Sequence, residues 1–353
     1  MKRYIKIFLS VGSLMILILD VQTAIKGIQD ALDVCIRSVI PSLLPFLILS
    51  KYITGNMIGV KIPLISRIGE SCGIPAGLDS ILGIGWIGGY PTGAQAIKDA
   101  YRKKCIDRVT AQKILGFCNN AGPAFIFGIS ASLFTKKWIG WIVFLIQIIS
   151  SILVGLMIPI KRTVEKKKMP ESTITLIESV EKGIKSMALI CGWILCFRII
   201  LTYINRYLLV HDPFVEVFIS GVLELSNGCL SLGMLDSEAA KFIILNGMLS
   251  FGGICVWMQT KAVSDGLKLK WFIVGRCLQC IISTTLAYIA QIWLFPADHI
   301  GHWLIPMLLT TIVICFEILC FNQKIIVASW RQIMYNSSKK CEKRDLYAVS
   351  QAD

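Results

Sequence analysis

The chain has 353 residues, of which 55% are hydrophobic and only 16% are charged. A soluble domain carries about 25% charged residues, so the composition excludes soluble globular, disordered and collagen-like proteins. The formal net charge of +14 comes from four basic stretches, at residues 1–6, 98–113, 161–168 and 322–353. Because this charge is not spread over one folded surface, a nucleic-acid-binding protein is excluded as well. Basic clusters between apolar runs instead indicate the cytoplasmic loops of a membrane protein.

The N-terminal region predicts a retained first membrane helix over residues 7–19, followed by an amphipathic segment over 24–37. Residues 39–50 predict a second span, which Pro41 and Pro45 kink. About 20 apolar residues are needed to cross the hydrocarbon core. Six further crossings are predicted over residues 114–135, 138–160, 186–204, 242–258, 271–294 and 303–321, which brings the total to eight.

Four apolar stretches are irregular. The predicted spans 114–135 and 242–258 are interrupted, at residues 119–123 and at residues 250–253. Residues 76–97 and 214–232 form two more apolar stretches. The first contains many glycines, and the second contains acidic residues. Irregular backbone survives at membrane depth only where protein or water satisfies it. We therefore expect these last two stretches to form re-entrant helical hairpins.

The charged loops predict the topology. With a cytoplasmic N-terminus, every basic cluster lies on the cytoplasmic side, whereas loops 233–241 and 295–302 lie outside. The order span, hairpin, polar loop, broken span, span occurs twice, and the equivalent loops carry opposite charge. The sequence therefore predicts an all-α polytopic membrane protein with about eight transmembrane helices plus two re-entrant hairpins in an inverted repeat. Inverted repeats with discontinuous helices are typical of secondary transporters.

The predicted divisions follow from this order. They are an N-terminal helix and amphipathic segment (1–33), a first repeat (34–160), a basic and amphipathic cytoplasmic linker (161–185), a second inverted repeat (186–294), a last transmembrane helix (295–321) and a basic cytoplasmic tail (322–353).

Four motifs occupy the predicted hairpins and breaks. They are GGYPTGAQ at 88–95, FCNNAGPAF at 117–125, LELSNG at 223–228 and SFGGICVWMQ at 250–259. In sequence and in order they resemble the nucleoside-recognition (Gate) domain membrane proteins, and most of all the sporulation members of that family, over about residues 30–295. The resemblance implies a membrane protein of endospore-forming bacteria, located in the outer forespore membrane, that passes dipicolinate from the mother cell toward the spore.

The candidate binding residues lie mostly in these motifs. Broken helices expose N-termini that attract anions, and glycine lets a ligand approach the backbone. Dipicolinate has two carboxylates beside a pyridine nitrogen, so it needs several donors and a flat slot. The candidate substrate-binding residues are Tyr90, Thr92, Gly93, Gln95, Asn119, Asn120, Arg198, Glu224, Ser226, Asn227, Gly252, Gly253 and Gln259.

Charges within the predicted spans are the sharpest candidates, since each costs roughly 2.5–3.5 kcal/mol at the bilayer centre. Glu224 could bind a coupling cation, or hydrogen-bond the solute when protonated. Arg198 could contact a solute carboxylate, neutralise Glu224, or form a structural pair with Glu224 or Glu317. Arg276 is close to the start of its predicted helix, so we expect its side chain to snorkel.

The chain has no nucleotide-binding, nucleophile-elbow or zinc-protease motif, so we expect neither an enzyme nor a cofactor or metal. The favoured function is transport of a small polar or anionic heterocyclic solute, with dipicolinate first. A nucleoside or nucleobase transporter is the alternative, and a structural or assembly protein of the spore envelope (cortex) is another. The expected partners are the solute, the lipid bilayer, a coupling cation and a second copy of the chain, without nucleic acid.

Overall fold

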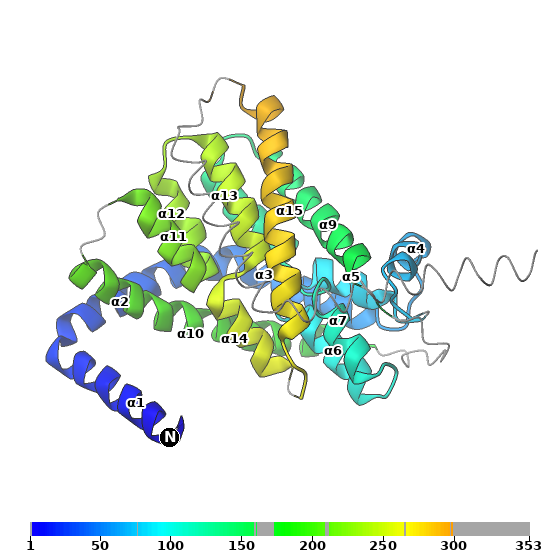
Figure 1. Cartoon of the computed structure of the whole chain (residues 1–353), viewed down its shortest axis with the longest axis horizontal. Coiled ribbons are helices and arrows are strands. Elements are labelled where there is room, and N and C mark those ends of the chain that lie inside the picture. Colours follow the sequence, from blue (N-terminus) through cyan, green and yellow to red (C-terminus); the bar gives the residue numbers. More distant parts are fainter. Residues whose placement is uncertain are drawn as a thin grey trace, which may run out of the picture.

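The computed structural model describes residues 2–75, 77–158, 160, 173–208, 212–264, 266–296 and 298, and each regular element in these ranges is helical (Figure 1). In chain order the elements are α1 (Lys2–Leu19), α2 (Val21–Val34), the π-helical turn η1 (Cys35–Val39), α3 (Ile40–Asn56), α4 (Pro63–Ser71), α5 (Ser80–Ile87), α6 (Thr92–Arg102), α7 (Arg108–Ile114), α8 (Pro123–Leu133), α9 (Ile139–Met157), α10 (Leu176–Leu208), α11 (Pro213–Leu223), α12 (Leu225–Ser231), the short 3₁₀ turn η2 (Leu232–Met234), α13 (Glu238–Phe251), α14 (Gly253–Val263) and α15 (Lys270–Leu294).

Four segments are long and apolar enough to cross a membrane: Ile139–Met157, Leu176–Tyr207, Glu238–Val263 and Lys270–Leu294. The bent pair Ser10–Leu19 and Val21–Arg37, which meets at 94°, adds a fifth if it counts as one span. The described part of the chain therefore has four or five candidate spans, where the sequence predicted eight crossings over the whole chain.

The difference has two sources. Two predicted crossings correspond to shorter helices, because α3 has 17 residues and α8 has 11. At 1.5 Å per residue, even α3 is only about 26 Å long, less than the roughly 30 Å hydrocarbon core. The predicted last span, residues 303–321, and the basic tail both lie outside the described residues.

Both predicted helix breaks are present. Residues 115–122 separate α7 from α8. Gly252 separates α13 from α14, and the φ angles of Gly252 and of Gly253, the first residue of α14, are +80° and +72°, in the left-handed region that favours glycine. The indole N–H of Trp257 donates to the Phe251 carbonyl at 2.9 Å, which satisfies a backbone group at this break.

Each stretch predicted as a hairpin holds two short helices that pack together, and a re-entrant position in a membrane stays a prediction. α5 and α6 form the first hairpin, and α11 and α12 form the second. The second hairpin is closely packed, since a Cβ atom on Gly228 would lie 2.3 Å from the Gly221 Cα atom. A hairpin, a broken helix and a long helix thus occur in the same order twice, in α5–α9 and in α11–α15.

The loops that were predicted on one side of the membrane lie together. At one end, the Thr135 hydroxyl donates to Glu238 at 3.3 Å and the Ser237 hydroxyl donates to Asp298 at 3.0 Å. At another place, the Asn56 amide donates to the Ile174 carbonyl at 3.2 Å. The first two contacts join predicted outer loops, and the third joins predicted cytoplasmic ones. The predicted topology itself stays a prediction.

The helices pack in two main groups. α9, α13 and α15 contact one another, and a buried polar network joins them: the Ser250 hydroxyl donates to Gln147 at 2.9 Å and lies 2.7 Å from the Ser283 hydroxyl. α2, α3 and α10 form the other group, and α2 and α10 lie side by side in Figure 1. Residues of both hairpins, the first break, α14, α3 and α10 line one pocket, which is described below.

Two boundaries differ from the sequence prediction. α10 begins at Leu176, inside the segment predicted as a linker, and runs for 33 residues. The amphipathic segment and the second span are joined by η1 into one helical run from Val21 to Asn56. Pro41 follows the π-helical turn at the start of α3, and Pro45 lies inside α3.

Candidate functional site

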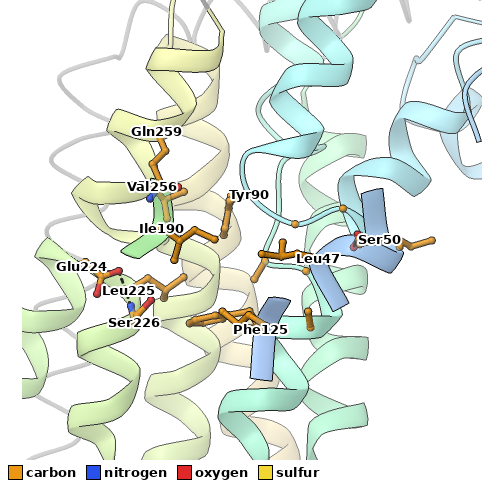
Figure 2. Close-up of a pocket in the computed structure, with 17 residues that line it drawn as sticks. Leu47, Ser50, Tyr90, Phe125, Ile190, Glu224, Leu225, Ser226, Val256 and Gln259 are labelled. Carbon is orange, nitrogen blue, oxygen red and sulfur yellow. Dashed lines mark hydrogen bonds between the residues drawn. The ribbon is translucent and has the colours of Figure 1, made fainter. Parts of the chain in front are cut away.

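A pocket of about 70 Å³, here called the central pocket, lies where both hairpins, the first break and α14 meet (Figure 2). Figure 2 shows Glu224, Ser226 and Gln259 toward one side of it, and Leu47 and Ser50 toward the other. The lining residues are Leu43, Leu47 and Ser50 of α3; Ile87, Gly88, Gly89 and Tyr90 of the first hairpin; Ala121, Gly122, Ala124 and Phe125 at the first break; Ile190 of α10; Glu224, Leu225 and Ser226 of the second hairpin; and Val256 and Gln259 of α14.

Glu224 forms the turn of the second hairpin. One carboxylate oxygen accepts the backbone N–H of Ser226 at 2.9 Å, and the other accepts that of Asn227 at 2.6 Å. Glu224 is therefore the N-cap of α12, and only 3% of it is exposed. The Glu224 N–H donates to the Ser220 carbonyl at 2.7 Å, which ends α11. The cap positions this carboxylate at the pocket wall.

Tyr90 is on the link between α5 and α6, and it lines the central pocket. Its hydroxyl donates to the Leu249 carbonyl at 2.8 Å, just before the second break. The same oxygen accepts a hydrogen bond from Arg276 at 3.2 Å. Tyr90 thus joins the first hairpin to the second repeat, and it contributes an aromatic ring to the pocket wall.

Arg276 corrects a sequence prediction, because its side chain is fully buried and does not snorkel. Its Nη2 donates to the Gly116 carbonyl at 3.2 Å and to Asn120 Oδ1 at 3.1 Å. Its Nη1 lies 3.5 Å from the Ser250 carbonyl, in addition to Tyr90. Within α15, Arg276 is the one charged residue after Lys270. That isolated charge in an apolar run was the signal that could have found it.

Asn119 and Asn120 lie at the first break and are buried. Asn119 accepts the Ala94 N–H at 3.2 Å, at the start of α6, and donates to the Thr260 hydroxyl at 3.0 Å. The Asn120 amide donates to the Phe117 carbonyl at 2.9 Å. Asn119 therefore joins the first break to α6 and α14, Asn120 braces the backbone of the first break, and neither lines the pocket.

The structure separates the remaining candidates into three kinds. Ser226 and Gln259 line the central pocket, as do Tyr90 and Glu224. The buried residues Thr92, Gly93, Asn227, Gly252 and Gly253 lie in the framework around it. Thr92, for example, accepts a hydrogen bond from the Lys51 ammonium at 2.6 Å. Gln95 is exposed and donates to Asp99 at 3.0 Å, so it points away from the pocket.

Arg198 lies in a different cavity, of about 480 Å³, between α2, α10 and α11. This lateral cavity also contains Lys26, Asp30 and Glu216. The structure shows no ion pair between Arg198 and Glu224, and Glu317 is outside the described residues. Arg198 is therefore not brought to the central pocket.

Among the described residues, no group of three His, Cys, Asp or Glu side chains could hold a metal ion. The three histidines, His211, His299 and His302, lie outside the described residues. Chemically, the central pocket offers one carboxylate, an amide, hydroxyl groups and two aromatic rings. Such a site can bind a flat polar molecule, with hydrogen bonds at its edges.

The chain is similar to the sporulation integral membrane protein YlbJ of Bacillus subtilis (strain 168), with 24% identity over 333 residues. The alignment covers 79% of this chain and 80% of the relative. No family model matches, so membership of the Gate-domain family stays a prediction. No solved structure matches. The similarity and the apolar helices together support a sporulation membrane protein.

Proposed function

We propose that this protein transports a small polar or anionic heterocyclic solute across a membrane of the sporulating cell. The first candidate solute is dipicolinate, moved from the mother cell through the outer forespore membrane toward the forespore. In this proposal the two sets of hairpin, broken helix and long helix are inverted copies, and the hairpins are re-entrant. The protein binds and moves the solute without catalysing a reaction.

The position of the central pocket carries the proposal. It is lined by the first hairpin, the first break, the second hairpin and α14, which follows the second break. In secondary transporters built from inverted repeats, the substrate binds where discontinuous helices of the two copies meet. A purely structural membrane protein has no need to bring three irregular backbone segments, namely the two hairpins and the first break, to one pocket, because each costs regular hydrogen bonds.

The pocket volume indicates that solute entry requires movement. Ligand pockets usually have about 300–1,000 Å³, whereas this one has about 70 Å³. Leu43 and Leu47 of α3 and Ile190 of α10 line it together with residues of the hairpins and of the first break. We propose that the hairpin elements separate from α3 and α10 to admit the solute. Alternate opening to the two faces would then complete transport.

The charge of Glu224 constrains how an acidic solute can bind. A carboxylate on the pocket wall repels a second carboxylate, whereas a protonated Glu224 can donate a hydrogen bond to it. We propose that a proton, or another cation, accompanies an anionic solute to Glu224. Two backbone amides hold this side chain at the pocket wall.

A nucleoside or nucleobase is the second candidate. The observation that favours it is the neutral polar lining by Ser226 and Gln259 beside the Glu224 carboxylate, since these groups can hydrogen-bond to ring nitrogens and sugar hydroxyls. The coupling cation would then compensate Glu224 without involving the solute.

The test is uptake by liposomes that contain the purified full-length protein, with labelled dipicolinate and labelled uridine offered separately. We expect dipicolinate to accumulate faster than in empty liposomes. Gln259→Ala and Glu224→Ala should each lower uptake at least tenfold. Gln95→Ala is the matched control, because it removes the same side chain as Gln259→Ala from an exposed position.

The outcomes separate the candidate functions. Uptake of uridine alone would favour the nucleoside transporter. The proposal of transport through the central pocket is wrong if neither solute enters the liposomes, or if Gln259→Ala and Glu224→Ala retain full uptake at normal abundance. The structural or assembly function in the spore envelope would then be preferred.

A further inference from the structure

Arg276 is a buried charge without an opposite charge beside it. None of its surface is exposed, and within the described residues no carboxylate lies within 4.0 Å of its guanidinium. Burying an ion is costly unless it is paired or well hydrogen-bonded. The groups around it are neutral, and its Nε has no hydrogen-bond partner in the described structure. Its solvation is therefore incomplete.

The guanidinium lies directly behind the wall of the central pocket. Tyr90 and Asn120 both bind it, at 3.2 Å and 3.1 Å. The ring of Tyr90 lines the pocket, and the residues that follow Asn120, namely Ala121 and Gly122, line it too. Only one side chain therefore separates the positive charge from a bound solute.

The neutral partners do not cancel this charge at the pocket. Carbonyl and hydroxyl groups act as dipoles, whose potential decreases faster with distance than that of a whole charge. In a poorly solvated interior the interaction between two charges is stronger than in water. Glu224 is on another part of the wall, and two backbone amides bind its carboxylate. The Tyr90 side of the pocket thus keeps a positive potential.

We propose that Arg276 is the specificity-determining residue of the central pocket, and that its charge selects solutes with a carboxylate or another anionic group. This inference rests on the proposed function, since it names the class of solute that the same pocket takes. Arg276 need not contact the solute directly while Tyr90 occupies its Nη1. Its role is to make the potential at the pocket wall positive.

The test measures this potential without using a solute. Gln259, which lines the pocket and is half-buried, is replaced by cysteine in a full-length chain without other reactive cysteines. The thiol introduced by Gln259→Cys is the reporter. It is labelled separately with an anionic and with a cationic thiosulfonate reagent of similar size. The ratio of the two rates reports the local potential and not accessibility, because both reagents must reach the same atom.

We expect Arg276→Gln to lower the anionic-to-cationic rate ratio about tenfold, the order expected for removing one partly screened charge from behind the pocket wall. Asn120→Asp should lower it similarly, because the new carboxylate contacts Nη2 and neutralises the charge while the arginine stays. Arg276→Lys should keep the ratio, since it keeps the charge but loses the planar fork. Arg37→Gln, at an exposed surface position, is the matched control and should change nothing.

An unchanged ratio in both Arg276→Gln and Asn120→Asp would overturn the proposal. If Arg276→Gln does not fold, Asn120→Asp alone decides. The proposal would also be overturned if Arg276→Lys lowered the anionic-to-cationic rate ratio as much as Arg276→Gln does, because hydrogen-bond geometry would then explain the effect. If the rate ratio falls as expected in Arg276→Gln and Asn120→Asp but the liposomes take up no dipicolinate, only the solute proposed above is contradicted.

Discussion

The contact between Gly275 and Gly116 gives a sharp prediction about how the central site is held together. A Cβ atom added at Gly275 would lie 2.0 Å from the Gly116 carbonyl oxygen. Ordinary contact begins at 3.4 Å, so Gly275→Ala must move α15 by about 1.4 Å from the end of α7. Arg276 is the next residue and moves with it. Its hydrogen bonds to Gly116 and Asn120 should therefore break.

The expected cost follows from these changes. Interhelical hydrogen bonds in membrane proteins contribute about 0.6–1.7 kcal/mol each, so two of them give about 1–3 kcal/mol. Overpacking costs a similar amount, about 1–3 kcal/mol. Alanine in a helix recovers up to about 1 kcal/mol relative to glycine. We expect a net loss of about 2–4 kcal/mol, together with reduced solute uptake.

Unfolding by heat and by denaturant in detergent measures this loss. Gly192→Ala is the matched control, because Gly192 also lies inside a helix, α10, but a Cβ there would meet nothing within 4 Å. It should leave stability unchanged or slightly higher. If Gly275→Ala is as stable as Gly192→Ala and transports normally, the result contradicts the close contact between Gly275 and Gly116.

Three further predictions concern the framework. Gln147→Leu should cost about 1–2 kcal/mol, since it breaks the buried network between α9 and α13; a melting temperature equal to that of the parent protein would contradict this. Asp107 is the N-cap of α7, and Asp107→Ala should cost about 1 kcal/mol at pH 7. Burial alone would raise the pKa of Asp107, but hydrogen bonds from Thr110 and Val109 lower it below its usual value. The contribution of Asp107 is therefore present above the usual pKa of aspartate and is lost as the pH falls through the lowered pKa; a difference between parent and variant that persists unchanged at the lowest pH would refute this. In sealed cells, a membrane-impermeant thiol reagent should label Thr135→Cys but not Lys103→Cys, whereas equal labelling would contradict the predicted topology.

The type of protein was readable from the sequence, because composition and hydropathy act through local and additive effects. The apolar runs at 138–160 and 271–294 predicted α9 and α15 closely. The breaks were also readable, since paired glycines and the Asn-Asn-Ala-Gly-Pro run disfavour a continuous helix whatever surrounds them. Helix boundaries were less accurate where charged residues continue a helix beyond the apolar part, as in α10.

The composition of the site depended on the tertiary structure. Gln95 and Gln259 both lie in motifs, yet only Gln259 lines the pocket, because helix rotation turns Gln95 to the surface. Arg198 seemed central by its place in a span, but α10 directs it to the lateral cavity.

For Arg276, the sequence predicted an exposed side chain that the structure buries. Its distance from the helix start suggested an exposed end, whereas the structure packs that turn of α15 against Gly116 and buries the charge. The amino-acid sequence by itself determined a helical membrane protein with two hairpins and two broken helices. Which polar groups face one another was decided only by tertiary packing, because partners such as Arg276 and Tyr90 are 186 residues apart. No local pattern encodes the rotation of one helix against another.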